Sequence, residues 1–346
     1  GPRKVLRPGT LFHAVGRETM QKLAAFRPQH LSSLTWAFAA VDLEDRELFR
    51  AVALEAMLKV KHFRPRELAG LSYAFARLHE RDPQMFQKIA KEAVEVAKDF
   101  NTHELSNVMW SLATLWLDEQ ELFHAVSKEA LVKLAHFSPQ GLSNLAWAFA
   151  ILEMHDSELF RAIPKLALAQ IDGFSPQGLS NLAWSMASLE VADLPLLQAI
   201  AYEASPSMSL FKSLELWNLA WAFAKLSVKD AVLFEALSAE ALMKLRDFSP
   251  KALANTVWAF ATLRVLDEAL LAAVGREAMA KMEAFTPQSL SSLAWAFGTL
   301  SAAEPELLRV IAKQALLNLH DFTPQGLSSL AWVFGRRRRS PEGQEP

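Results

Sequence analysis

The sequence predicts an all-α protein, a right-handed α-solenoid of helix-turn-helix repeats with a period of 37 residues. A phenylalanine recurs at this period without a slip, and an aromatic residue follows each phenylalanine ten residues later. Fixed periods of roughly 20–50 residues are typical of stacked repeats. The anchor phenylalanines are Phe26, Phe63, Phe100, Phe137, Phe174, Phe211, Phe248, Phe285 and Phe322. The aromatics are Trp36, Tyr73, Trp110, Trp147, Trp184, Trp221, Trp258, Trp295 and Trp332.

The first helix of each repeat, helix A, is predicted from its capping signal and apolar spacing. In the unit that starts at Phe137, Ser138 is a good N-cap and Pro139 suits the first helical position. Leu142 and Phe149 lie on one apolar face of a helix that should end near Leu152. The same Ser/Thr-Pro signal recurs at Ser175-Pro176, Ser249-Pro250, Thr286-Pro287 and Thr323-Pro324.

The second helix, helix B, is predicted to start at a recurrent acidic residue, because such a residue caps a helix and suits its dipole. In the same unit it should end near Ile171, and Pro164 within it should bend the stack, as should Pro206 in the next unit. The acidic residues are Asp45, Asp82, Glu119, Asp156, Asp193, Asp230, Asp267 and Glu304.

These signals divide the chain into eight full repeats with a half repeat at each end. Residues 1–10, which begin with a Gly-Pro pair like a protease-cleavage scar, are expected to be a flexible start. Residues 11–336 form a single repeat domain: a lone helix B at 11–25, full repeats at 26–321 and a lone helix A at 322–336. Residues 337–346 are expected to be a flexible basic tail.

Composition excludes several classes of protein. The chain has no cysteine, which rules out disulfides, thiolate metal sites and cysteine nucleophiles. It has no run of about 18 apolar residues, so no membrane span is expected. The net charge of −2 gives no basic footprint of the kind that nucleic-acid binders show, although a basic stripe on one face stays open.

Residues 137–150 read FSPQGLSNLAWAFA, and related versions stand at 174–187, 285–298 and 322–335. With this motif, the chain resembles the heptatricopeptide and octotricopeptide group of organellar repeat proteins, and its period fits the heptatricopeptide class better. The resemblance implies an RNA-binding protein of the mitochondrion or plastid that acts in transcript stabilisation, processing, translation or assembly of ribosomal RNA and ribosomes. Many members end in a nuclease-like domain. No such domain follows Trp332, so no enzymatic activity is expected.

The resemblance also implies that helix A lines the concave side and binds single-stranded RNA there. A helical wheel predicts exposed places three, four, seven and fourteen residues after each anchor. At places 3 and 7, amides, hydroxyls and cations could contact bases or phosphates; at place 14 only three residues are cationic. The candidate residues at place 3 are Gln29, Arg66, His103, Gln140, Gln177, Lys251, Gln288 and Gln325. Those at place 7 are Ser33, Asn107, Asn144, Asn181, Asn218, Asn255, Ser292 and Ser329, and those at place 14 are Arg77, Lys225 and Arg336.

Structural interpretations compete with these assignments. The tryptophans, at place 10, are expected to be spacers that pack on small residues of the neighbouring repeat, and the alternative is a ladder that stacks nucleobases. The asparagines either hold helix A to a neighbouring loop or contact bases. Charged residues late in the B helices are expected to form a solvated outer face. They are Lys59, Lys61, Lys91, Lys98, Lys128, Lys133, Lys165, Lys244, Arg276, Lys281 and Lys313, with acidic partners such as Glu55, Glu92, Glu129, Glu203, Glu240 and Glu277.

A protein-interaction scaffold, for example a subunit of an organellar ribonucleoprotein, is the alternative function. The near-neutral charge and the scarcity of cations on helix A favour it. The expected partners are therefore single-stranded RNA and other proteins of such a particle, with no small-molecule substrate. The histidines show no metal-ligand spacing, so we expect no metal and no cofactor. The basic run from Arg336 to Arg339 is only weak evidence for nucleic-acid contact.

Overall fold

The computed structural model describes residues 8–301 and 305–337, and within these residues it is all-helical, with no strand. The A helices are α2 (Pro28–Ala40), α4 (Pro65–Arg77), α6 (Thr102–Thr114), α8 (Pro139–Ile151), α10 (Pro176–Ser188), α12 (Ser213–Lys225), α14 (Pro250–Thr262), α16 (Pro287–Thr299) and α18 (Pro324–Arg337). The B helices are α1 (Pro8–Lys22), α3 (Arg46–Lys59), α5 (Pro83–Glu95), α7 (Gln120–Val132), α9 (Ser157–Ala169), α11 (Leu194–Ala204), α13 (Ala231–Lys244), α15 (Glu268–Ala280) and α17 (Pro305–Leu317).

A 3₁₀ turn follows each B helix and leads to the next anchor phenylalanine. These turns are η1 (Leu23–Ala25), η2 (Val60–His62), η3 (Ala97–Asp99), η4 (Leu134–His136), η5 (Ile171–Gly173), η6 (Ser205–Leu210), η7 (Leu245–Asp247), η8 (Met282–Ala284) and η9 (Leu319–Asp321). The repeat architecture is confirmed, with α1 and α18 as the unpaired terminal helices. Its handedness stays a prediction.

The ends of the described chain differ slightly from the expected ones. Helix α1 begins at Pro8, three residues before the expected Leu11, so part of the expected flexible start is helical. Helix α18 runs to Arg337, one residue beyond the expected end. The rest of the predicted flexible segments, as well as Glu304 and the last two arginines of the basic run, lie outside the described residues.

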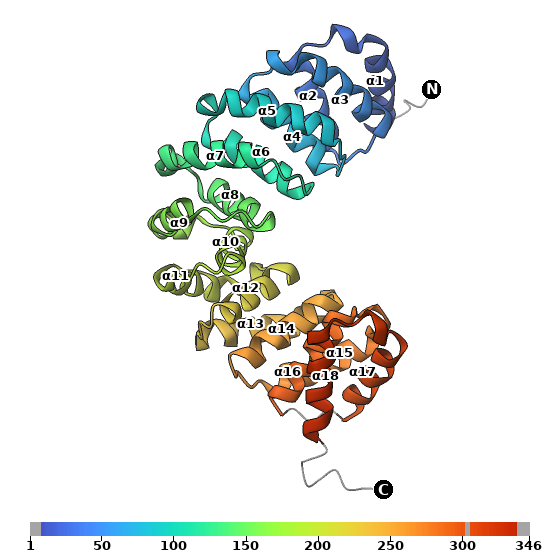
Figure 1. Ribbon diagram of the computed structural model, residues 1–346, viewed down its shortest axis with the longest axis vertical. Helices are drawn as coiled ribbons and strands as arrows, with labels where there is room; N and C mark the ends of the chain where they lie inside the picture. The colour runs from blue at the N-terminus through green and yellow to red at the C-terminus, as the bar shows by residue number, and fades with distance from the viewer. Residues whose placement is uncertain (1–7, 302–304, 338–346) are drawn as a thin grey trace, which may run out of the picture. The chain divides into compact units, whose positions relative to one another are not determined.

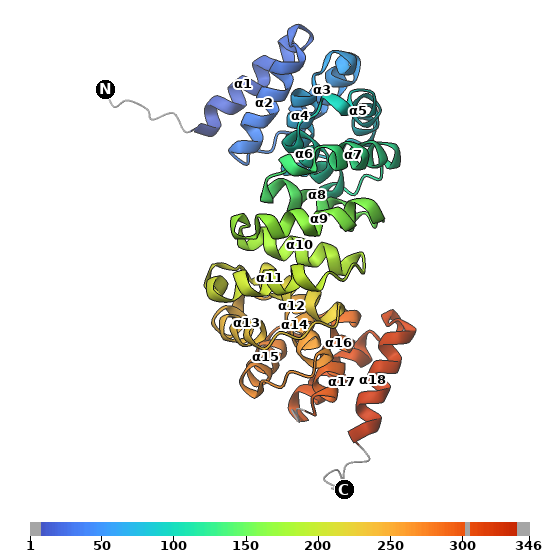
Figure 2. The same cartoon turned by 90° about the vertical axis from the view of Figure 1, so that its left-hand side faces the viewer.

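The chain forms two compact units, Gly1–Ala169 and Gln170–Pro346. The first unit contains α1 to α9, and the second contains α10 to α18; the single repeat domain stays a prediction. Within each unit, successive A helices contact one another over most of their length, and successive B helices touch over a shorter stretch (Figures 1 and 2). In a curved stack the more closely spaced layer is the inner one, so it stays a prediction that helix A lines the concave side.

The core of each unit lies between its A and B layers and is rich in phenylalanine. Phe38, Phe49, Phe75 and Phe86 alternate between the two layers and are buried. Their ring centroids lie 6.4, 4.8 and 6.3 Å apart in that order, mostly edge to face, which is a favourable aromatic geometry. In the second unit, Phe234 and Phe260 repeat the contact at 5.0 Å. This packing fixes which face of helix A is left for solvent.

The N-caps of the A helices are confirmed at all five predicted Ser/Thr-Pro positions. The Ser138 hydroxyl, for example, accepts a hydrogen bond from the Gly141 amide at 3.1 Å. The four others do the same at 3.1–3.2 Å: Ser175, Ser249, Thr286 and Thr323. Helix α6 lacks the Ser-Pro signal, and there Asn101 and Glu104 accept each other's backbone amides at 2.9 Å in a capping box.

The aspartate caps of the B helices are also confirmed. In each case, a carboxylate accepts the amide three residues later at 2.9–3.1 Å, as the Asp45 carboxylate does from Leu48. The five others are Asp82, Asp156, Asp193, Asp230 and Asp267. Glu119 stands at the N-cap of α7, as predicted, but its longer side chain makes no capping bond. Burial and the neighbouring acids Asp118 and Glu121 raise the pKa of Glu119.

The two prolines in the B layer act differently from each other. Helix α9 continues through Pro164, which is buried within it. Helix α11 ends at Ala204, before Pro206, and is followed by a longer 3₁₀ segment of six residues. Pro206 therefore shortens its helix, because it cannot donate the backbone hydrogen bond that would extend it.

Each described hairpin turns at a residue in the left-handed region, sixteen places after its anchor. The φ angle is 55° at Asp42, 54° at Glu153 and 56° at Glu190. Where the next residue is also described, its amide bonds back to the carbonyl five residues before it, as that of Leu43 does to Phe38 at 3.1 Å. This is a Schellman ending, which usually carries glycine. None of these residues is glycine, so each turn bears a local strain.

Candidate nucleic-acid interface

One face of each A helix points away from the B layer, and it carries places 3, 7, 10 and 14. These places are separated by four, three and four residues, so they line up along one side of a helix. In α8 they are Gln140, Asn144, Trp147 and Ile151, of which the first is exposed and the others are half-buried. We call this surface the A face. It contains the three predicted places that supplied the candidate residues.

The prediction that place 4 is exposed was wrong for most repeats. Gly141, Gly178 and Gly326 are buried at this place. A Cβ on Gly141 would stand 3.0 Å from the hydroxyl oxygen of Ser106, which donates to the Gly141 carbonyl at 3.0 Å. Place 4 is where adjacent A helices approach each other, so it is closed to a ligand.

Place 10 belongs to the A face instead, which the sequence assignment of exposed places missed. Four aromatics form this row in the first unit, and five form it in the second. Trp36 is 56% exposed and Trp332 is 44% exposed, and the other rings are half-buried. We call this set the aromatic row: Trp36, Tyr73, Trp110 and Trp147 in the first unit, and Trp184, Trp221, Trp258, Trp295 and Trp332 in the second.

The expected spacer role accounts for only one side of these rings. The Cζ3 atom of Trp332 lies 3.4 Å from where a Cβ on Gly298 would stand, so this ring packs on a small residue of the preceding repeat. Neighbouring rings also touch, with centroids 5.3 Å apart for Tyr73 and Trp110. The remaining surface of the rings faces solvent. No indole N–H donates a hydrogen bond to another described residue.

The asparagines at place 7 do not hold helix A to a loop. In the described part of the chain, the side-chain amides of Asn144, Asn181, Asn218 and Asn255 make no hydrogen bond, although all four residues are half-buried. The side-chain amide of Asn107 lies 3.2 Å from the His103 ring nitrogen. None of these four amides is among the buried polar groups without a partner, so their atoms reach solvent. These four are therefore available to an external one.

Place 3 is exposed in every repeat, as predicted. The side chains of Gln140, Gln177, Gln288 and Gln325 make no hydrogen bond to another described residue. Lys251 lies over the ring of Trp217, with its Nζ atom 5.6 Å from the centroid. Place 3 therefore gives the A face further unpaired side-chain amides and one cation that lies against an aromatic ring.

The predicted cations at place 14 are partly neutralised. The Arg77 guanidinium lies 4.0 Å from the Asp42 carboxylate, and the Lys225 ammonium lies 2.8 Å from that of Glu190. Each acid sits at the turn that ends the preceding A helix. These pairs are exposed, and such pairs contribute little stability. A ligand phosphate can therefore displace either acid.

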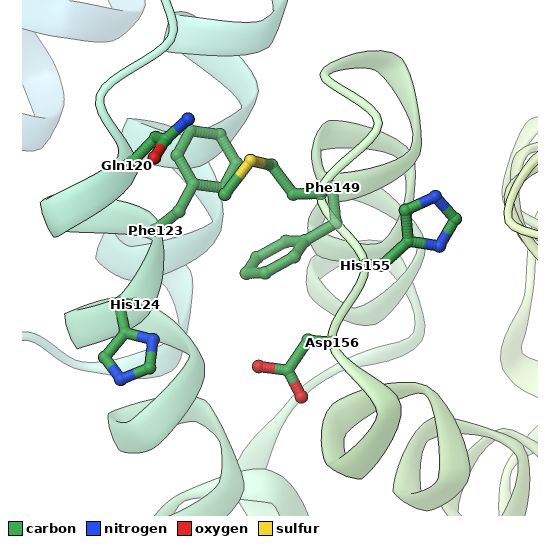
Figure 3. Close-up of a pocket in the computed structure, with 7 residues that line it drawn as sticks. Gln120, Phe123, His124, Phe149, His155 and Asp156 are labelled. Atoms are coloured by element: carbon green, nitrogen blue, oxygen red, sulfur yellow. The ribbon is translucent and has the colours of Figure 1, made fainter.

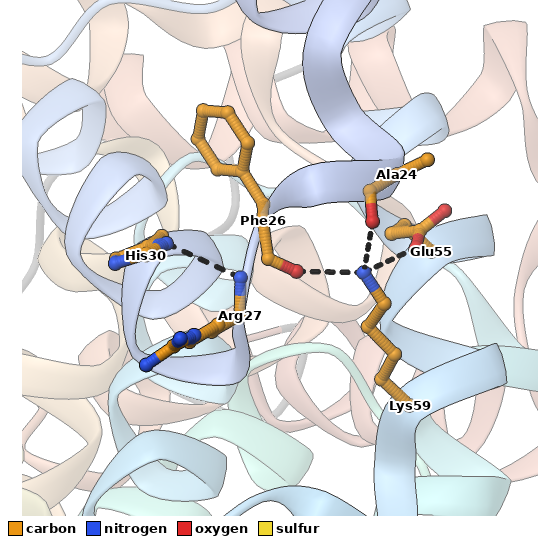
Figure 4. A network of polar contacts seen from close by, with 6 residues as sticks. All are labelled: Ala24, Phe26, Arg27, His30, Glu55 and Lys59. Carbon is orange, nitrogen blue, oxygen red and sulfur yellow. Dashed lines mark hydrogen bonds and ion pairs between the residues drawn. The ribbon is translucent and has the colours of Figure 1, made fainter.

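Four lysines expected on a solvated outer face are instead structural. The Lys59 Nζ atom donates to the carbonyls of Ala24 and Phe26 at 2.8 and 2.6 Å, and it pairs with Glu55 at 2.6 Å (Figure 4). Its side chain is 24% exposed. The contact joins the end of one B helix to the turn that ends the previous one. The same contact is made by Lys133 with Glu129, Lys244 with Glu240 and Lys281 with Glu277.

A hollow of ≈ 180 Å³ lies beside α7 in the first unit (Figure 3). It is smaller than the roughly 300–1,000 Å³ typical of small-molecule sites. The rings of His124 and His155 lie on opposite sides of it, so they do not converge on a common point. Its lining residues are Gln120, Phe123, His124, Phe149, Met154, His155 and Asp156. We assign no chemistry to it.

The carboxylate of Asp156 in this hollow has a structural role. It accepts a hydrogen bond from Ser127 and caps α9 through the Leu159 amide at 2.9 Å. Ser238 and Asp267 repeat the first contact in the second unit. Among the described residues, no group of three histidine, aspartate or glutamate side chains is placed to hold a metal ion, and no helix is long and apolar enough to span a bilayer.

Sequence comparison then places the chain in a family. A family model described as RNA-editing substrate-binding complex 6 protein matches residues 3–231, more than half of the chain. The chain belongs to this family. None of the curated proteins compared with it matches. Among solved structures, a homology model of the full-length AP-3 complex in an intermediate open conformation matches 94% of this chain and 67% of its own, at 12% identity and a TM-score of 0.33, too low to support an argument.

The family is one of RNA-associated helical-repeat proteins, which agrees with the coarse form of the resemblance noted from the sequence. Its description does not name the heptatricopeptide or octotricopeptide class. It also gives no support to a plastid location. The family match does not identify binding residues, so the assignment of the A face as a binding surface depends on the geometry described above.

Proposed function

We propose that this protein is an RNA-binding subunit of an RNA-editing complex and that it binds single-stranded RNA on the A face. The family description supports the first part, because it names a complex that binds the substrate of RNA editing. The unpaired amides support the second. We further propose that it acts in the mitochondrion, that it is not an enzyme, and that its repeats are of the heptatricopeptide type.

The row of free asparagine amides at place 7 is the observation that carries the RNA-binding proposal. Each amide offers both a donor and an acceptor, the combination that pairs with base edges. One such group per repeat fits helical-repeat recognition, in which each repeat contacts one base of an unpaired strand. Because the amides at Asn144, Asn181, Asn218 and Asn255 have no partner among the described residues, binding breaks no hydrogen bond within that part of the chain.

The charge of the A face predicts how binding depends on salt. Its cations at places 3 and 14 are Arg66, Arg77, Lys225, Lys251 and Arg336. Single-strand binding loses about 0.7 units of log K per unit of log salt for each phosphate neutralised, so five contacts give a slope of at most about 3.5. We therefore expect shallow salt dependence, unlike that of a protein that binds mainly through phosphates.

Fluorescence anisotropy with a random pool of single-stranded oligoribonucleotides tests the proposal. Replacing Asn144, Asn181, Asn218 and Asn255 together by alanine should weaken binding at least about tenfold, since even one base-edge contact is worth about 1–3 kcal/mol. A control variant carries alanine at the exposed B-helix glutamines Gln84, Gln87 and Gln198. Absence of binding at low salt by a folded protein would refute the proposal. Equal affinities of the two variants would show that the asparagines do not contact the RNA.

A second function, protein interaction within the same complex, is favoured by an exposed apolar patch in the second unit. Tyr202 is 79% exposed, Leu210 is 69% exposed and Met243 is 82% exposed. They belong to α11, η6 and α13, which contact one another. Large exposed apolar groups close together mark interaction surfaces. Serine at Leu210 and Met243 should abolish capture of a partner from the complex while leaving RNA affinity unchanged.

A further inference from the structure

The aromatic row has two features that a purely structural spacer would not need. Its rings keep part of their surface in solvent although they lie on the A helices, which pack closely on one another. Its indole N–H groups donate to no acceptor in the described part of the chain, so they are available to an acceptor on a ligand. Both features indicate a surface prepared for a flat ligand that carries hydrogen-bond acceptors.

We propose that the aromatic row is the surface on which nucleobases stack, so that the A face holds single-stranded RNA by its bases more than by its phosphates. The inference rests on the proposed RNA-binding function and specifies how that face binds. Asn144 and Trp147 lie three residues apart on one helix face, so a base stacked on a ring lies within reach of the amide beside it. The ring supplies sequence-tolerant affinity, and the amide supplies recognition of the base edge.

The distances between rings decide how a base approaches the row. A base inserted between two rings needs contact of about 3.5–4.0 Å on both sides, or about 7–8 Å between the rings. The centroids of Tyr73 and Trp110 are 5.3 Å apart, and those of Trp184 and Trp221 are 6.2 Å apart. These pairs are too close for insertion. Bases therefore stack on the solvent-facing side of a ring.

The few acidic groups near the row support a nucleic-acid ligand. Glu67, Glu104 and Glu215 lie in the first turns of their helices, and each accepts the backbone amide of its N-cap residue at 2.8–2.9 Å. Their carboxylates are thus engaged in capping. Beyond the first turn, no described residue at places 7, 10 or 14 is acidic. Along the A helices, phosphates that follow stacked bases consequently meet little repulsion, and the turn acids Asp42 and Glu190 are paired with Arg77 and Lys225.

The test uses two tryptophans of similar exposure, one inside the row and one outside it. Trp36 belongs to the row and is 56% exposed, and Trp116 lies at the hairpin turn and is 64% exposed. Trp36→Leu should weaken binding of single-stranded RNA by about fivefold or more, the loss expected for one stacked base. Trp116→Leu should leave the affinity unchanged. Both rings are exposed, so neither substitution removes a core side chain, and circular dichroism checks that both variants are folded.

An abasic oligomer of the same length provides the second measurement. It keeps every phosphate and removes every base, so the unaltered protein should bind it at least about tenfold more weakly than RNA. Equal binding of RNA and the abasic oligomer, or equal effects of the two tryptophan substitutions, would overturn base stacking while leaving RNA binding established. Failure of the unaltered protein to bind any single-stranded RNA would instead refute the proposed function itself.

Discussion

Replacing Lys133 by methionine should destabilise the first unit more than its position late in a B helix would suggest. Its Nζ atom donates to the Lys98 and Phe100 carbonyls at 2.7 and 2.8 Å and pairs with Glu129 at 3.2 Å. Hydrogen bonds of a charged group contribute about 1.5–3 kcal/mol each, and releasing the lysine side chain returns about 1.5–2 kcal/mol of entropy. The net loss should be about 2–4 kcal/mol in the free energy of unfolding.

Thermal and urea denaturation followed by circular dichroism measure this loss, which corresponds to a fall of about 4–16 °C in Tm for a unit of this size. Lys128→Met is the matched control, since Lys128 lies in the same helix, is exposed and makes no ion pair with a described residue. Adding Glu129→Gln to Lys133→Met should recover part of the loss, because it removes the carboxylate left without its partner. Equal stability of the two single variants would refute the structural role of Lys133.

Three further substitutions test the repeat geometry by the same denaturation measurements. Gly141→Ala should destabilise by about 1–3 kcal/mol because its Cβ meets a serine hydroxyl at 3.0 Å, and Gly335→Ala, with nothing within 4 Å, should be neutral or stabilising. Glu119→Asp should gain about 1 kcal/mol by capping α7. The pKa of Glu119 is raised in the folded state, so protonation at low pH stabilises the fold of the unaltered protein. The stability difference between Glu119→Asp and the unaltered protein should therefore shrink in acid. Glu153→Gly should gain about 0.5–1 kcal/mol by relieving its positive φ, whereas Lys128→Gly in mid-helix should lose about 1 kcal/mol.

The hairpins were predictable because their signals are local. A capping serine such as Ser138 accepts a hydrogen bond from an amide only three residues away. The preference of proline for the first turn of a helix is equally local. Because the motif recurs every 37 residues, the helix bounds predicted for one repeat can be transferred to the others. Even the unpredicted cap of α6 follows this rule, since Asn101 and Glu104 form a capping box that can be recognised from their spacing.

The outer charges were not predictable in the same way, because their roles depend on residues about 33–35 positions away. Lys91 and Lys133 both come late in their repeats, but Lys91 stands 28 residues after its anchor phenylalanine and Lys133 stands 33 residues after its own, as the other three structural lysines do. Only Lys133 reaches the turn that ends the preceding B helix. Whether a cation is solvated or structural is decided by the register between neighbouring helices, and a single helix does not contain that information.

The A face shows the same division. By itself, the sequence determined that the chain is a stack of helical hairpins, because period, caps and apolar spacing act within one unit. Only tertiary packing decided which places are open. Close approach of adjacent A helices buries place 4, as at Gly141, and leaves the ring of Trp147 at the surface. Helix amphipathicity predicts exposure from the polarity of each helix face. Exposure itself depends on the distance between neighbouring backbones, which buries the glycine at place 4 and leaves the aromatic ring at place 10 partly exposed.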